Sequence, residues 1–203
     1  ASVVHRERHD AMKQGFDPIL LSAGDNFLPS PEFDARLESG TFYDAKAINL
    51  LRYDAVAIGN HDFDMGPVVL AEFIEQANED NPFTEPRLIP FLSANLDYTG
   101  SPELSRLVEK NMVASSSIVF TGQNTIGVIG ATTENLPFIS SPGAVTVKDV
   151  AESVSAEVAK LEAAGVDANP VVTDIRAVDV DGDNYVDLIA TWPEFPLIAW
   201  YRN

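Results

Sequence analysis

The chain of 203 residues has no cysteine and only three histidines. Without thiols, disulfide-stabilised scaffolds, cysteine-ligated zinc sites and thiol nucleophiles are excluded. Basic residues are also scarce, because 13 Lys and Arg stand against 31 Asp and Glu, for a formal net charge of −18. That balance argues against a nucleic-acid polymer as a partner. No apolar run reaches the roughly 18 residues that mark a membrane-spanning helix, so no membrane span is predicted.

What the sequence does contain indicates a folded protein. Hydrophobic residues make up 45% and charged residues 22% of the chain, which is typical of globular domains. The length suffices for one ordinary domain and a small addition. Near Asn169–Pro170 a helical pattern gives way to a strand-rich one, and both tryptophans lie beyond that point. We therefore predict two units, residues 1–168 and residues 171–203.

The first unit alternates between helical and strand patterns. Apolar spacing predicts helices over Val3–Lys13, Tyr43–Arg52, Pro67–Asn78, Ser101–Lys110 and Val147–Ala164. Short apolar runs predict strands over Ile19–Ala23, Ala55–Ile58 and Phe91–Leu96, followed by a strand pair over 118–121 and 125–131. This order predicts an α/β domain whose sheet lies between helices. Ligands of such sheets bind at the carboxyl ends of the strands.

Two of these strand ends carry unusual polar residues. The first apolar strand runs into Gly24-Asp25-Asn26, and the second runs into Gly59-Asn60-His61-Asp62-Phe63-Asp64. A glycine permits a sharp turn, after which the polar side chains are held at the edge of the sheet. Each segment alone could be an ordinary Asx turn that ends a strand. Their occurrence at two successive strand ends favours a functional site.

These two segments, residues 20–27 and 57–66, resemble signature blocks of the calcineurin-like metallophosphoesterases. Residues 90–96, 127–133 and 139–143 resemble the 5′-nucleotidase branch of that superfamily. The resemblance extends over about residues 1–168. It implies an αββα sandwich and metal-dependent hydrolysis of phosphomonoesters, with nucleotides as the expected substrates.

The resemblance also implies roles for individual residues. Asp25 matches the carboxylate that bridges two divalent transition metals of the Mn, Zn or Fe class, and Asn60 matches an amide ligand of the second metal. His61 matches the histidine that contacts the transferring phosphoryl group and stabilises the leaving oxygen. Asp64 matches the acid that pairs with this histidine and orients it. No direct role is expected for Asp62.

Parts of the family pattern are missing from this chain. There is no opening Asp-x-His block, and no histidine follows His61, although the family has two later histidine blocks. His5 and His9, four residues apart on a predicted helix, are better explained as solvated side chains than as a metal-binding pair. The resemblance thus implies an incomplete sandwich, with the missing domain parts in the full-length gene. We expect weak or no phosphate-ester hydrolysis from this chain alone.

The second unit contains an aspartate-rich loop. Side-chain oxygens of Asp179, Asp181, Asp183 and Asp187, with the backbone carbonyl of Tyr185, provide the hard ligands that Ca²⁺ prefers. Apolar runs over Leu188–Thr191 and Leu197–Tyr201 predict two strands that follow the loop. The segment resembles one FG-GAP or VCBS-type repeat, which implies a β-propeller-like hairpin with calcium in its loop. A plain acidic turn is the alternative.

Two functions therefore remain open from the sequence. One is metal-dependent hydrolysis of the 5′-nucleotidase type. The other is a non-catalytic calcium-binding surface or adhesion module in which the α/β unit is only a scaffold. The absence of cysteine, the acidic balance and the expected calcium loop together predict an extracellular or periplasmic location.

Overall fold

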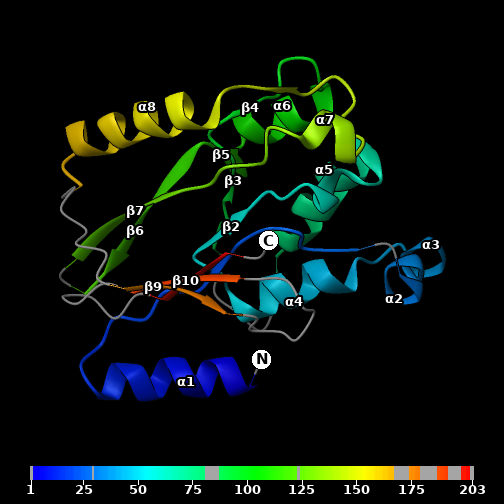
Figure 1. Cartoon of the computed structure of the whole chain (residues 1–203). Coiled ribbons are helices and arrows are strands. Elements are labelled where there is room, and N and C mark those ends of the chain that lie inside the picture. The colour runs from blue at the N-terminus through cyan, green and yellow to red at the C-terminus, as the bar shows by residue number, and fades with distance from the viewer. Residues whose placement is uncertain are drawn as a thin grey trace.

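A four-stranded parallel sheet lies at the centre of the protein (Figure 1). Its order is β1 (Leu21–Ser22), β2 (Ala55–Ala57), β3 (Phe91–Leu92) and β5 (Val113–Ala114), and each neighbouring pair is parallel. The computed structural model describes residues 2–28, 30–80, 87–122, 124–166, 174–178, 187–191 and 198–201. The parallel sheet confirms the predicted α/β class.

Helices follow the strands much as the apolar spacing predicts. The longer helices are α1 (Ser2–Lys13), α4 (Tyr43–Leu51), α5 (Gly66–Ala77), α6 (Pro102–Glu109) and α8 (Val150–Ala163). The short ones are α2 (Pro31–Asp34), α3 (Arg36–Ser39), α7 (Leu136–Ile139) and the 3₁₀ turn η1 (His61–Phe63). Proline stands in the first turn of α5 and α6, where its missing N–H costs no helical hydrogen bond. The five predicted helices are thus confirmed to within a few residues.

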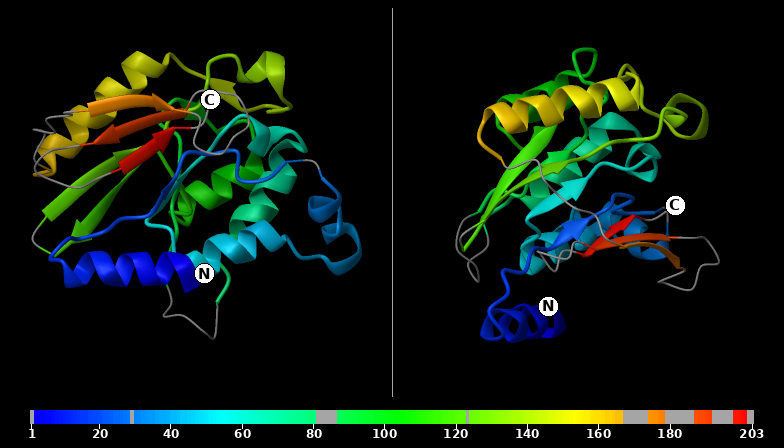
Figure 2. Two further views of the ribbon diagram at one scale, coloured as in Figure 1. Left: turned by 60° about the horizontal axis from the view of Figure 1, so that its bottom comes forward. Right: turned by 60° about the vertical axis from the view of Figure 1, so that its left-hand side comes forward.

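Helix α1 lies beside the C-terminal end of α4 (Figure 2), where Arg8 donates to the carbonyl of Arg52 at 3.0 Å. Asp54, which is buried at the beginning of β2, connects it to the body. Its carboxylate accepts a hydrogen bond from Arg8 on α1 at 2.7 Å and another from the backbone N–H of Leu20 at 2.7 Å. Because an unpaired buried carboxylate would be costly, this pairing fixes α1 against the amino ends of β1 and β2.

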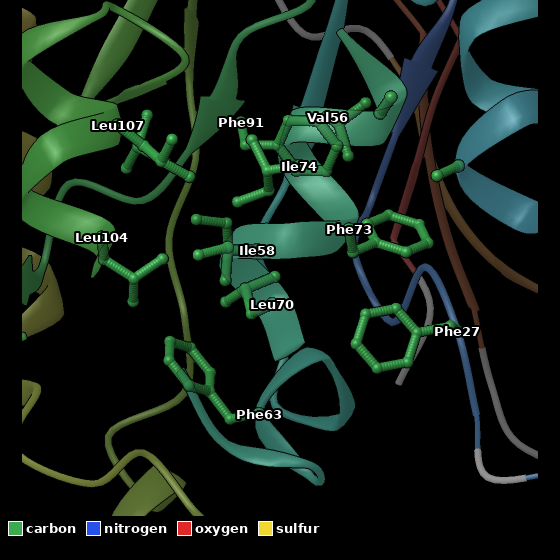
Figure 3. Packing of buried hydrophobic residues seen from close by; sticks show 14 of the residues in the cluster. Phe27, Val56, Ile58, Phe63, Leu70, Phe73, Ile74, Phe91, Leu104 and Leu107 are labelled. Atoms are coloured by element: carbon green, nitrogen blue, oxygen red, sulfur yellow. The ribbon is translucent and has the colours of Figure 1, made fainter. Parts of the chain in front are cut away.

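The hydrophobic core fills the space between the sheet and α5. Figure 3 shows Val56 of β2 and Ile58, just after β2, gathered with Leu70 and Ile74 of α5, all of them fully buried. An aromatic group continues this core toward the loop after β1. In that group Phe73 lies 4.7 Å from Phe27 and 6.2 Å from Phe91 between ring centroids. The core therefore anchors both polar strand ends on one rigid support.

One predicted strand is wrong. Phe91–Leu96 does not form a single strand, because β3 ends at Leu92 and β4 (Leu96–Asp97) belongs to another sheet, paired with β8 (Thr146–Val147). Between them, the buried side chain of Asn95 makes two hydrogen bonds with the backbone of Thr132, each of 2.8 Å. Its Nδ2 donates to the carbonyl of Thr132, and its Oδ1 accepts from the N–H of Thr132. These two hydrogen bonds hold the chain at Asn95, between the end of β3 and the start of β4.

The sandwich expected from the family resemblance is only partly present. The predicted strand pair is confirmed as the antiparallel hairpin β6 (Ser116–Thr121) and β7 (Asn124–Ile129). Within residues 2–166, leaving out the gaps named above, the pairings outside the parallel sheet are two-stranded, β4 with β8 and β6 with β7. A full second sheet is therefore not seen in that part of the chain.

The C-terminal segment forms a three-stranded antiparallel sheet. Its strands are β9 (Asp174–Val178), β10 (Asp187–Thr191) and β11 (Ile198–Tyr201). Strands β10 and β11 match the two predicted strands, whereas β9 precedes the aspartate-rich segment and was not predicted as a strand. The predicted calcium ligands Asp179, Asp181, Asp183 and Tyr185 lie outside the described residues, and Asp187 is described only as the first backbone position of β10. The calcium site and the boundary between residues 168 and 171 stay predictions.

In the described ranges, no helix has the length and apolar character to cross a bilayer.

Candidate functional site

The two polar strand ends touch each other through their glycines. A Cβ atom on Gly24 would lie 2.8 Å from the backbone nitrogen of Gly59, and Gly24 has a φ of +109°. A Cβ on Gly59 would lie 2.2 Å from Oδ1 and 2.5 Å from the backbone nitrogen of Asp25. Side chains are therefore excluded at both positions, and the loop after β1 packs backbone to backbone on the loop after β2.

This contact places Asp25 over the turn that carries His61. Oδ1 of Asp25 accepts a hydrogen bond from the backbone N–H of His61 at 2.9 Å, although the two residues are 36 positions apart. Asp25 itself has a φ of +50°, a left-handed conformation that is uncommon for a residue with a side chain. Such backbone strain persists only where the surroundings fix it, and it concentrates at functional sites.

His61 and Asp64 form a direct pair across the 3₁₀ turn. Nδ1 of the imidazole lies 2.7 Å from Oδ2 of Asp64, so the carboxylate holds the proton on Nδ1 and leaves Nε2 free. This hydrogen bond is the main cause that raises the pKa of His61, and the nearby Asp25 adds to it. The sequence-based pairing of His61 with Asp64 is thus present in the structure.

Asp62, to which the sequence assigned no direct role, joins the two loops. The residue is fully buried, and its Oδ1 accepts from the backbone N–H of Asn26 at 2.7 Å. Its Oδ2 accepts from the Asn26 side chain at 2.9 Å and from the N–H of Gly59 at 2.7 Å. Burial raises the pKa of Asp62 to about 7 despite these three donors. No local sequence signal reveals the two hydrogen bonds to Asn26, because Asn26 follows a different strand from Asp62.

A second group of polar residues forms hydrogen bonds with the backbone at the end of β2. The hydroxyl of Thr132 donates to the carbonyl of Ile58 at 2.6 Å and lies 2.8 Å from the Ser93 hydroxyl. All three residues are buried. This network brings residues 90–96 and 127–133, two of the stretches that resemble the nucleotidase branch, beside the loop that carries Asn60 and His61.

The residues present suit part of a metal site. Carboxylate and amide oxygens are hard ligands, and neither Oδ2 of Asp25 nor the side chain of Asn60 has a hydrogen-bond partner among the described residues. However, no cluster of three or more His, Asp or Glu side chains suited to a metal occurs in the described part of the chain. His5 and His9 are exposed on α1. Two oxygen donors fit a divalent cation but do not complete its coordination.

The His61–Asp64 pair predicts a measurable titration change. In Asp64→Asn, the pKa of His61 is expected to fall toward the ordinary value of about 6.5, because the charged acceptor is lost. Since the folded state binds this proton more tightly, the pair stabilises the wild-type protein below about pH 6.5, and this contribution is lost as the pH rises through the folded pKa. This contribution to the free energy of unfolding is small, because the His61 side chain is 44% exposed and solvent screens its charge. NMR titration of the ring checks the shift, and an unchanged pKa would contradict the pairing.

Comparison with known proteins gives a consistent result. No family model matches the sequence. The chain is 29% identical over 167 residues to apyrase from Anopheles gambiae, which covers 82% of this chain and 26% of that protein. It is 32% identical over 145 residues to human 5′-nucleotidase, covering 71% of this chain and 23% of the relative. The chain thus spans about a quarter of the length of these relatives.

A solved structure agrees with these sequence matches. The crystal structure of a 5′-nucleotidase precursor from Thermus thermophilus superposes with a TM-score of 0.63 at 33% sequence identity. The superposition covers 79% of this chain and 28% of that one. None of these three matches extends over the whole of this chain or of the relative. In sequence and in fold, the chain is similar to the N-terminal region of the 5′-nucleotidase family of calcineurin-like metallophosphoesterases.

Proposed function

We propose that this chain supplies part of a metal-dependent phosphomonoesterase site that acts on nucleotides. The observation that carries the proposal is the contact between the two strand ends, where Asp25 and His61 are joined by a 2.9 Å hydrogen bond. A plain pair of turns does not require a strained aspartate held against a second loop. The homology to 5′-nucleotidases and an apyrase supports a nucleotide as the substrate.

In this proposal His61 acts on the transferring phosphoryl group. With Nδ1 bound to Asp64, the free Nε2 can donate to a phosphoryl oxygen when the ring is protonated, and it can protonate the leaving oxygen. The raised pKa of His61 keeps the ring protonated over a wider pH range than a free histidine. Asp64 then fixes the orientation of the ring and stabilises its positive charge.

Asp25 and Asn60 would hold the metal in this proposal. When bound, divalent cations acidify a water molecule and neutralise charge on the phosphoryl oxygens. The remaining ligands would come from residues outside the described ranges, in this chain or in a longer protein. We therefore expect this chain alone to hydrolyse phosphate esters weakly or not at all.

The proposal is tested by substrate binding. In the presence of Zn²⁺, adenosine monophosphate is expected to shift the ring resonances of His61 in NMR spectra, whereas adenosine is not, because only the phosphate reaches Nε2. Asp25→Ala should abolish the shift. An equal response to both compounds, or no response to adenosine monophosphate at millimolar concentration, would contradict the proposal.

A second function is proposed for the C-terminal segment. The antiparallel pairing of β9 with β10 supports this proposal, because four predicted calcium ligands, Asp179, Asp181, Asp183 and Tyr185, stand between these strands in the sequence and the fifth, Asp187, begins β10. We expect one Ca²⁺ to bind with a dissociation constant of about 10⁻⁴ to 10⁻³ M, which is typical of extracellular modules. Asp181→Ala should weaken binding at least about tenfold in calorimetry, whereas the exposed Asp149→Ala should not. Equal affinities would exclude the loop. An extracellular or periplasmic location is part of the same proposal.

A further inference from the structure

Ser140 contacts the site from a segment far away in the sequence. Its hydroxyl donates to Oδ1 of Asp64 at 2.7 Å, across 76 positions of the chain. The other oxygen of the same carboxylate, Oδ2, binds Nδ1 of His61 at 2.7 Å. Each oxygen of Asp64 therefore has its own partner, and the three side chains form a continuous chain of hydrogen bonds.

The segment that carries Ser140 is held in place on both sides. Ser140 ends α7, where its N–H donates to the carbonyl of the fully buried Leu136 at 3.1 Å. A few residues later Val145 is also buried. Gly143, with a φ of +61°, allows the segment to lie on Pro67, since a Cβ there would be 3.1 Å from Cγ of the proline. The backbone on both sides of Ser140 is thus supported by contacts other than the bond to Asp64.

From this geometry we propose that Ser140 is a positioning residue for His61, acting through Asp64. An ionised carboxylate only accepts hydrogen bonds, so the hydroxyl donates and fixes the rotation of the carboxylate about its Cβ–Cγ bond. That rotation decides whether Oδ2 is aimed at Nδ1. Ser140 therefore helps to keep the imidazole proton on Nδ1 and to leave Nε2 free for the phosphoryl group. The catalytic meaning of this arrangement rests on the proposed function.

Removing the hydroxyl should change the imidazole without unfolding the protein. In Ser140→Ala the carboxylate is free to turn, and the preference of neutral His61 for the tautomer with the proton on Nδ1 should fall about fivefold, the effect of one ordinary hydrogen bond. Ser140→Thr keeps the hydroxyl and should restore the wild-type ratio. Ser141→Ala, at the exposed neighbouring position, is the matched control and should leave the ratio unchanged.

The tautomer ratio is read from the ¹⁵N chemical shifts of the His61 ring in the full chain, at a pH where the ring is neutral. Backbone spectra of the same samples establish that each variant is folded, and Ser140→Cys, with a weaker donor of similar shape, replaces Ser140→Ala if the latter is unfolded. A shifted ratio in Ser140→Ala or Ser140→Cys, restored in Ser140→Thr, supports the proposal. An unchanged ratio in the folded variant overturns it.

This readout separates the two proposals, because it requires neither metal nor turnover. If the ratio shifts but His61 never responds to adenosine monophosphate, the positioning role stands and the phosphoesterase role fails. If His61 responds to the nucleotide but the tautomer ratio is the same in wild type and Ser140→Ala, the phosphoesterase role stands and the positioning role of Ser140 fails.

Discussion

Replacing Asp62 by alanine is expected to lower the free energy of unfolding by about 3 kcal/mol or more. The carboxylate is fully buried and accepts three hydrogen bonds, two from Asn26 in the loop after β1 and one from Gly59 in its own loop after β2. Without it, the backbone N–H groups of Asn26 and Gly59 lose their acceptor inside the protein. Each buried, unsatisfied donor costs roughly 1–3 kcal/mol, so the losses exceed those of an ordinary surface substitution.

Urea denaturation measures this change, and Asp149→Ala is a suitable control. Asp149 also accepts a backbone hydrogen bond, from Glu152 at 2.7 Å, but it does so at the exposed start of α8. Loss of such a helix cap costs about 1 kcal/mol. If Asp62→Ala destabilises the protein no more than Asp149→Ala, Asp62 does not join the two loops in the way described.

Gly59→Ala is expected to cost about 3 kcal/mol and to displace Asp25. The added methyl group would lie 2.2 Å from the Asp25 carboxylate and 2.5 Å from its backbone nitrogen. The carboxylate could rotate away, but the backbone nitrogen belongs to a loop that is fixed by the core around Phe27. The two strand ends must therefore separate, and the bond between Asp25 and the N–H of His61 should break.

Gly40→Ala distinguishes this clash from the general cost of replacing a glycine. Gly40 has a φ of +70°, but a methyl group added there would have no atom within 4 Å. Only backbone strain of about 1 kcal/mol is expected at this position. The amide resonance of His61 should move in Gly59→Ala and stay in Gly40→Ala. A Gly59→Ala protein of wild-type stability with an unmoved His61 amide would show that the close contact does not exist.

The sequence was sufficient to predict the local parts of this arrangement. Apolar spacing located the five longer helices, and glycine followed by polar residues located the two polar strand ends. The pairing of His61 with Asp64 was also accessible, because it depends on residues three apart in one turn and on the family resemblance. These features depend on interactions over short distances in the chain.

The long-range supports were not predictable in the same way. Asp62 reaches Asn26 across 36 positions, and Ser140 reaches Asp64 across 76. Neither Asp62 nor Ser140 differs, as a residue type in its local sequence, from an ordinary solvated side chain. The strand expected over Phe91–Leu96 failed for a related reason, since Asn95 binds Thr132, a residue from a distant part of the chain. Side-chain bonds between distant segments override the local pattern.

Binding of Mn²⁺ to the purified chain tests the central claim most directly. If the two strand ends form part of a metallophosphoesterase site, electron paramagnetic resonance should detect bound Mn²⁺ in the wild type and a clear loss of it in Asp25→Ala and Asn60→Ala. Asp149→Ala, which removes one negative charge as Asp25→Ala does but far from the strand ends in sequence, should bind like the wild type. Binding that is equal in wild type and Asp25→Ala, or absent from the wild type at millimolar Mn²⁺, would contradict the claim.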